Sequence, residues 1–162
     1  MLPAPRSLLF AVLAAGLTLA AAPAHARLGD TLADIKKHRG SPLPQKRPDV
    51  ALWVFEGVDG QLGYSVTFNA AGKSIAEGLK PIKNARLTPE IADDFMRAQL
   101  EPFRGSKTVR KVQPGEKYIF AGQVLTCGED EAVIVDDPNG LLIVWTKGAL
   151  ASVVAVSAER LK

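Results

Sequence analysis

The sequence has 162 residues and is nearly balanced in charge, with 20 Lys and Arg against 17 Asp and Glu and a formal net charge of +3. So small a surplus of positive charge does not favour a nucleic-acid-binding surface. The single cysteine, Cys127, cannot form a disulfide within the chain, so packing alone has to stabilise the fold.

The N-terminus has the layout of a secretory signal. A basic residue, Arg6, precedes an apolar stretch from Leu8 to Ala22, and the small residues Ala24 and Ala26 follow. This pattern predicts a signal peptide at 1–26 that is cleaved after Ala26. The stretch is shorter than the roughly 20 residues of a membrane-spanning helix, so we expect no membrane span after cleavage. We therefore expect a periplasmic or secreted protein.

The remainder of the chain, 27–162, is long enough for one domain with a hydrophobic core and short for two. A lipid anchor would need a cysteine directly after the apolar stretch, and Cys127 lies far from it. We therefore expect a single domain without a lipid anchor.

The first predicted element is a short helix that begins at Thr31. The Thr31 hydroxyl and Asp34, three positions on, form the pattern of a capping box. Leu28, Leu32 and Ile35 recur at helical spacing and form a narrow apolar stripe. The helix is expected to end before Gly40, because "HRGSP" combines a glycine that can adopt a left-handed conformation with a following proline.

Three strands are predicted next. The segment "VALWVFEG" at 50–57 reads as a strand, and apolar residues alternate with small or polar ones over 62–68. After the turn "NAAG", a weaker strand follows in "KSIAEGL" at 73–79. A helix and a three-stranded meander are thus expected over 28–79.

A second helix and about four further strands are predicted over 87–162. Thr88 can cap a helix whose first residue is Pro89, with Glu90 in the first turn; Ile91 and Phe95 form its apolar side. The predicted strands are "YIFAGQVLTC", "AVIVD", "LLIVW" and "ASVVAVS", of which the second and third form the clearest hairpin.

These elements together predict an α+β fold. We expect antiparallel sheets with two short helices packed on their apolar faces, in the order helix, meander, helix, sheet. Because a helix followed by strands occurs twice, an internal duplication stays open.

The motifs of the first half resemble a known family. They cover 28–79 and comprise Gly29 and Thr31 at the helix start, Gly40 and Pro42 at its end, Trp53 and Phe55 in the first strand, and Phe68, Asn69 and Gly72 at the second turn. This pattern is similar to the BamE (SmpA/OmlA) type of outer-membrane assembly proteins and to their superfamily, which includes the β-lactamase inhibitory proteins. The resemblance implies a non-catalytic exported domain that acts by contact, through one sheet face and its loops.

Residues that could carry chemistry are sparse. His38 is the only histidine after cleavage, and a metal site usually requires two or more His or Cys ligands. In "DDPNG", Asp136, Asp137 and Asn139 fit a turn better than a calcium loop.

The acids of the second helix, Glu90, Asp93 and Asp94, are expected on its solvated side. Trp53 and Trp145 lie inside apolar strands and are expected in the core or on a sheet face. We therefore predict no catalytic residue, metal site or cofactor.

Charge is the one uneven feature of the sequence. From Arg104 to Lys117 there are five basic residues and one acid, whereas five acids and no base lie between Glu129 and Asp137. One interpretation is two solvated loops of opposite sign that face each other. The other is a contact surface for a charged partner such as an anionic lipid head group or a cell-wall polymer, formed by Arg104, Lys107, Arg110 and Lys111.

The leading functional hypothesis is an exported, non-catalytic binding or structural protein of the bacterial cell envelope. Its expected partner is another envelope protein or an anionic envelope component. The alternative is a small envelope hydrolase or lipid-modifying enzyme that uses Cys127 or carboxylates.

Overall fold

The structure is a computed structural model that describes residues 27–82 and 85–161. The predicted signal peptide, 1–26, lies outside the described residues. Among the residues described, no helix is long and apolar enough to cross a membrane.

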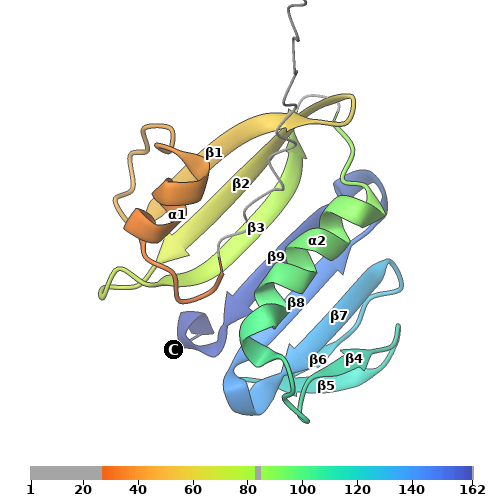
Figure 1. Ribbon diagram of the computed structural model, residues 1–162. Helices are drawn as coiled ribbons and strands as arrows, with labels where there is room; N and C mark the ends of the chain where they lie inside the picture. Colours follow the sequence, from red (N-terminus) through yellow and green to blue (C-terminus); the bar gives the residue numbers. More distant parts are fainter. Residues whose placement is uncertain (1–26, 83–84, 162) are drawn as a thin grey trace, which may run out of the picture.

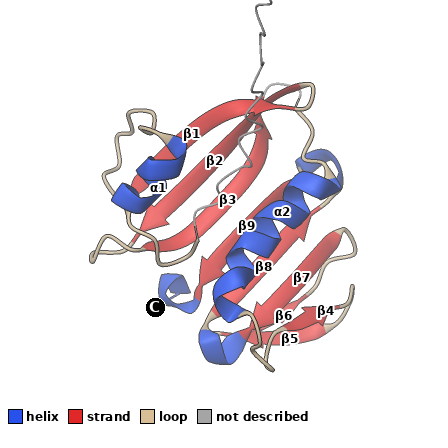
Figure 2. Cartoon of the chain, in the orientation of Figure 1, coloured by secondary structure: helices blue, strands red, loops and turns tan. Residues whose placement is uncertain are grey.

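The described part of the chain is dominated by one antiparallel sheet of seven strands (Figures 1 and 2). Its strands, in spatial order, are β1 (Val50–Gly57), β2 (Gly60–Phe68), β3 (Ser74–Ile82), β9 (Ser152–Ser157), β8 (Leu141–Thr146), β7 (Glu131–Asp136) and β4 (Arg110–Val112). Strands β5 (Lys117–Phe120) and β6 (Gln123–Thr126) form a separate hairpin. The α-helices are α1 (Leu32–Arg39) and α2 (Pro89–Leu100), and the 3-10 turns are η1 (Glu101–Phe103), η2 (Asp137–Asn139), η3 (Gly148–Leu150) and η4 (Ala158–Leu161).

The predicted fold class is therefore wrong. The chain is not an α+β arrangement of helix, meander, helix and sheet, because the strands of both halves belong to one large sheet. The last strand, β9, pairs with β3 of the first half, with Ala76 opposite Val156 and Leu79 opposite Val153. The error has a physical reason: alternation along a strand shows which face is apolar, but it does not show which strand lies alongside.

Several local predictions are confirmed and others are wrong. The meander β1–β2–β3 and the hairpin β7–β8 form in antiparallel register as expected. The predicted strand at 118–127 is instead two short strands, because the chain reverses at Ala121 and Gly122, both with positive φ. Strand β4 lies in the basic connection, where no strand was predicted.

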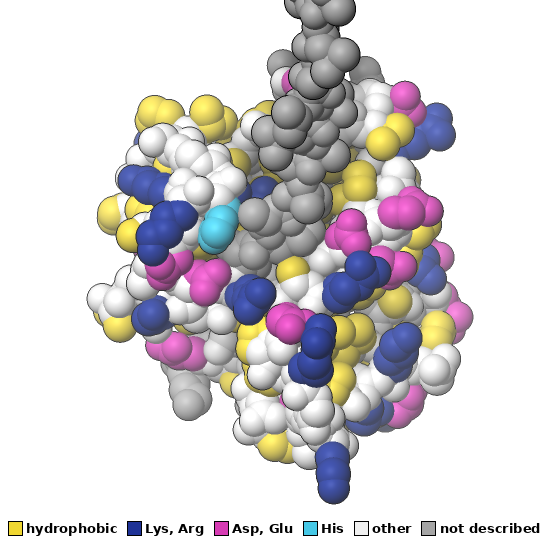
Figure 3. Space-filling view, viewed as in Figure 1, with side chains coloured by type: hydrophobic (Ala, Val, Ile, Leu, Met, Phe, Trp, Pro, Cys, Tyr) yellow, Lys and Arg dark blue, Asp and Glu magenta, His cyan; other side chains and the backbone are white. Residues whose placement is uncertain are grey.

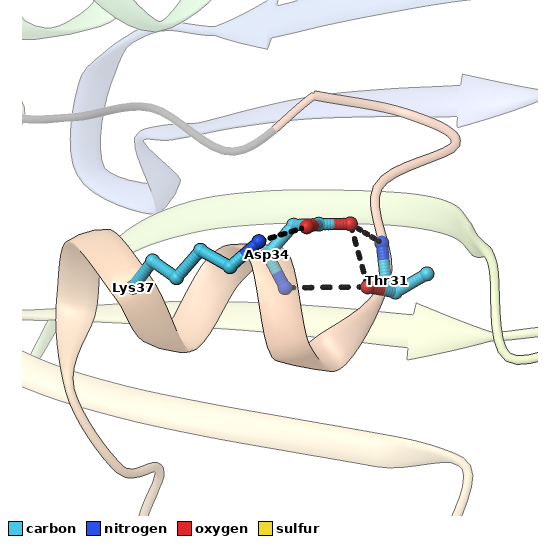
Figure 4. Close-up of polar contacts among 3 residues, drawn as sticks. All are labelled: Thr31, Asp34 and Lys37. Atoms are coloured by element: carbon cyan, nitrogen blue, oxygen red, sulfur yellow. Dashed lines mark hydrogen bonds and ion pairs between the residues drawn. The ribbon is translucent and has the colours of Figure 1, made fainter.

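Helix α1 begins as its sequence predicts. The Asp34 backbone N–H donates to Thr31 Oγ1 (3.2 Å), and the Thr31 N–H donates to Asp34 Oδ2 (3.3 Å), which completes the capping box (Figure 4). Lys37 donates to Asp34 Oδ1 at 2.8 Å on the exposed side. The hydrogen bond from Lys37 and those from Thr31 lower the pKa of Asp34. The helix docks through one buried residue, Ile35.

Helix α2 is also confirmed, with Thr88 as cap and Pro89 at its start. It lies along β9 and β8, whereas α1 lies over β1 and β2 on the same face of the sheet (Figure 1). Ala92, Phe95 and Met96 anchor α2 in a core that both helices share with the sheet. The hairpin β5–β6 covers the opposite face of β7 and β8, where Tyr118 and Phe120 bound a second apolar core.

We predict that removing the cap of α1 destabilises the protein measurably. Thr31→Ala deletes the acceptor of the Asp34 N–H and should lower the free energy of unfolding by about 1 kcal/mol in urea denaturation. Thr31→Ser keeps the hydroxyl and should stay within about 0.5 kcal/mol of the wild type. If the alanine variant matched the wild type, the capping box would contribute nothing to the docking of α1.

Candidate functional site

The four predicted contact residues do not form one surface. Arg104 and Lys111 line a groove beside α2, whereas Arg110 lines a separate hollow next to the hairpin β5–β6. Arg110 is paired with Glu116 at 2.7 Å. Lys107 is exposed and lines neither of these two depressions. The basic stretch and the acids at 129–137 lie side by side, because β4 pairs with β7, but within the described ranges no ion pair joins them.

The groove has a volume of about 1050 Å³, compared with about 390 Å³ for the hollow next to the hairpin β5–β6. It forms where α2 leaves the β7 side of the sheet uncovered. Figure 3 shows hydrophobic side chains there, between Lys and Arg side chains. Its apolar walls are Met96, Leu100 and Phe103 from α2 and η1, and Ala132, Ile134 and Trp145 from β7 and β8.

Charge on the rim of the groove is distributed unevenly. On the helix side, Arg97 and Arg104 are balanced by Asp94 (3.1 Å) and Glu101 (2.7 Å). On the strand side, Glu131 accepts the Gly128 N–H at 2.8 Å.

Two lysines complete the strand side of the rim. Over residues 27–82 and 85–161, Lys111 and Lys147 form no ion pair. Lys111 and Lys147 are therefore the cations of the groove without an ion pair, and Asp93 and Glu131, which also line it, are carboxylates without one among the described residues.

Lys147 and Trp145 are residues of this site that the sequence did not predict for it, although the core or a sheet face was expected for Trp145. The Lys147 ammonium lies 5.3 Å from the centre of the Trp145 ring. Trp145 and Lys147 also line a second hollow of about 580 Å³, bounded by Arg86, Pro89 and Gly148, so the two depressions meet at this pair. The Nε1 atom of Trp145 is buried and has no hydrogen-bond partner in the described part of the chain. The available signal was a tryptophan at the end of a strand, followed closely by a lysine.

A second polar feature lies inside the core. Glu77 of β3 is 1% exposed, and its Oε2 accepts hydrogen bonds from Tyr64 Oη and Gln99 Nε2, each at 2.7 Å. Its Oε1 lies 3.0 Å from Ser74 Oγ. These residues join β2, β3 and α2, and we refer to Tyr64, Ser74, Glu77 and Gln99 as the Glu77 cluster.

The hydrogen-bond count at Ser74 favours a protonated Glu77. Ser74 Oγ accepts the Gly29 N–H (3.0 Å), and its one proton can go either to the Arg27 carbonyl (2.9 Å) or to Glu77. A protonated Glu77 can donate to Ser74 Oγ, which leaves the Ser74 proton for Arg27. Burial raises the pKa of Glu77, although the hydrogen bonds from Tyr64, Gln99 and Ser74 act in the opposite direction.

Arg39 places a positive charge beside this cluster. Its guanidinium lies 4.0 Å from the centre of the Tyr64 ring and 5.6 Å from that of Phe55, a cation–π arrangement. Burial lowers the pKa of Arg39, and Tyr64 and Glu77 oppose that effect. Burial raises the pKa of Tyr64 as well, and the neighbouring Glu77 adds to the rise. The cluster thus joins the sheet to α2, and Arg39 brings α1 into contact with it through Tyr64.

Of the other residues considered for chemistry, His38, Asp136 and Asp137 lie apart from the groove, whereas Asp93 of α2 lines it. His38 is exposed on α1. The buried Asp136 carboxylate accepts from Ser106 (2.9 Å) and Thr108 (2.7 Å), and Asp137 accepts the Ala121 N–H at 2.8 Å, which fits the predicted turn. In the described ranges, no group of three or more His, Cys, Asp or Glu residues is placed to hold a metal ion.

Cys127 belongs to the core under the hairpin β5–β6. The residue is 1% exposed, and its Sγ lies 3.9 Å from the Val112 carbonyl oxygen. Burial raises the pKa of the Cys127 thiol, and the negative charge of Glu131 adds to the effect. Both effects disfavour the thiolate that a nucleophile needs.

Comparison with known protein families, curated proteins and solved structures gave no match to this chain. The resemblance of 28–79 to the BamE type therefore stays a prediction.

We predict that two substitutions at Glu77 have opposite outcomes. Glu77→Leu leaves the Tyr64 hydroxyl and Gln99 amide without this acceptor and should cost about 3 kcal/mol of unfolding free energy at pH 7. Glu77→Gln keeps an acceptor for both and a donor for Ser74, and should cost less than about 1 kcal/mol.

The pH dependence supplies the check on this prediction. Because folding raises the pKa of Glu77, its stabilising contribution is complete below its unfolded-state value of about 4.3 and is lost as pH rises through the folded-state value. The stability of the wild type relative to Glu77→Gln should therefore fall as pH rises from about 4. A difference that stayed constant or grew with pH would contradict the assignment.

Proposed function

We propose that this protein is an exported, non-catalytic binding protein of the bacterial cell envelope. It binds an anionic envelope component that has an apolar part, and the groove beside α2 is its binding site. The signal-like segment at 1–26 supports export. The observation that carries the binding proposal is an apolar groove whose strand-side rim has two lysines without ion pairs, Lys111 and Lys147.

The groove suits a ligand with two chemical parts. The side chains of Leu100, Phe103 and Trp145 offer apolar contact to a hydrocarbon or ring. A phosphate or carboxylate next to that part would pair with Lys111 or Lys147, which form no ion pair with a described acid. Small-molecule sites commonly combine a mostly apolar lining with a few polar groups, as here.

The positions of the titratable groups support binding rather than catalysis. Glu77 and Tyr64 are each 1% exposed and are hydrogen-bonded to each other within the core. Cys127 is 1% exposed on the other face of the sheet. A substrate in the groove could not reach any of these three groups without opening the core. The alternative of a Cys127-dependent enzyme is therefore less well supported.

We predict that reversing the two rim charges weakens binding of an anionic amphiphile. The probe is dodecyl phosphate, titrated by calorimetry below its micelle-forming concentration. The double variant Lys111→Glu/Lys147→Glu should raise the dissociation constant by a factor of about 10 or more, because two attractive contacts become repulsive.

A matched control carries the same charge change elsewhere. Lys46 and Lys80 are exposed, and neither lines the groove or forms an ion pair with a described acid, so Lys46→Glu/Lys80→Glu should bind the probe within about twofold of the wild type. Equal losses in both double variants would indicate an effect of net charge alone, and unchanged binding in the groove variant would rule out the groove as the binding site.

A further inference from the structure

The described chain begins with a short turn, 27–30, that is closed on itself. The Arg27 backbone N–H donates to Asp30 Oδ2 at 2.9 Å, and the Asp30 N–H donates to the Arg27 carbonyl at 2.9 Å. The Arg27 nitrogen is thus already held against a carboxylate.

The same turn is fixed to β3 and α2. The Gly29 N–H donates to the Ser74 carbonyl, and the Ser74 N–H donates to the Asp30 carbonyl, both at 2.9 Å. The Leu28 N–H donates to Gln99 Oε1 at 3.0 Å, and Ser74 Oγ donates to the Arg27 carbonyl. Ser74 and Gln99 belong to the Glu77 cluster, so the turn is a fixed part of the junction between the sheet and α2.

The position of this turn coincides with the predicted cleavage site after Ala26. Hydrolysis of the Ala26–Arg27 peptide bond consumes one water molecule and breaks the C–N bond. The water supplies the second oxygen of the new Ala26 carboxylate, and the nitrogen of Arg27 becomes an α-ammonium group. One N–H donor is thereby replaced by three donors that carry a positive charge.

We propose that the α-ammonium group of Arg27, released by signal cleavage, forms an ion pair with Asp30 that locks the N-terminal turn onto the Glu77 cluster. The inference rests on the export part of the proposed function. It assigns a role to Asp30: this carboxylate receives the new N-terminus, and processing converts the existing hydrogen bond from the Arg27 nitrogen into an ion pair.

Acidic and basic groups both lie around the turn that holds the new terminus. Asp30 lies next to it, and Asp34 lies in the first turn of α1. On β3, Glu77 is hydrogen-bonded to Ser74, which in turn bonds to the Arg27 carbonyl. Lys73, directly before β3, pairs with Thr31 in an isolated β-bridge. Asp30 is among the causes that raise the pKa of Glu77, and an ammonium paired with Asp30 would offset that contribution.

The test compares two forms of the exported protein, after its N-terminal residue has been identified by sequencing. One form carries the free α-amine, and the other has that amine acetylated, which removes its charge without extending the chain by a residue. At pH 6 the free form should have a melting temperature higher by about 2 °C. NMR titration should show the pKa of the α-amine above its ordinary range of about 7.7–8.0.

The pH dependence follows from the sign of that shift. A raised pKa in the folded state gives stability that is present below about pH 8 and is lost as pH rises through the folded-state value, so the two forms should converge near pH 10. Asp30→Asn should abolish the difference at pH 6, whereas Asp34→Asn should retain it.

Two adverse results are distinguishable. An exported protein whose first residue is not Arg27 would overturn both the cleavage prediction and this inference. A protein that begins at Arg27 but has equal melting temperatures with and without the acetyl group at pH 6 would overturn this inference alone.

Discussion

The structure depends on the pairing of β3 with β9. These strands come from the two halves of the chain, and their backbone hydrogen bonds make one sheet of what would otherwise be two. Leu79 and Val153 are opposite each other and fully enclosed between the sheet and the helices. Glu77 is opposite Ala155, a residue small enough to leave room for the carboxyl and its donors. The buried polar cluster thus lies at the line where the halves meet, and α2 is bonded to it through Gln99.

The width of this sheet explains the groove. Seven strands about 4.8 Å apart span roughly 29 Å, whereas a helix covers only about 10 Å. Helices α1 and α2 therefore leave the β7–β4 side of the sheet open on their face, and the walls of the opening retain apolar residues such as Phe103 and Trp145. Charged side chains around it, among them Lys111 and Lys147, keep that edge hydrated. The residues that line the groove all come from the second half of the chain, between Asp93 and Lys147.

Features that depend on near neighbours in the chain were predictable. The capping box of Thr31 and Asp34, the cap at Thr88 and the hairpin β7–β8 each involve adjacent segments. The pairing of β3 with β9 was not predictable, because the alternation of apolar and polar residues along a strand carries no information about which distant strand lies beside it. The basic stretch did not map onto one surface because Arg110 and Lys111 are consecutive residues of strand β4, whose side chains alternate between the two faces of the sheet. Trp145 was placed in a strand correctly, but its position beside an uncovered edge depends on where α2 lies.

The central claim is that the two halves are one cooperative unit, and its most direct test follows both halves within the same molecule. Trp53 lies in β1 and Trp145 in β8, so 5-fluorotryptophan gives each half its own 19F signal. In a urea titration the native signals of both should disappear with the same midpoint, because pairing across β3 and β9 couples their unfolding. Two separate midpoints, with one half folded while the other is not, would contradict the claim.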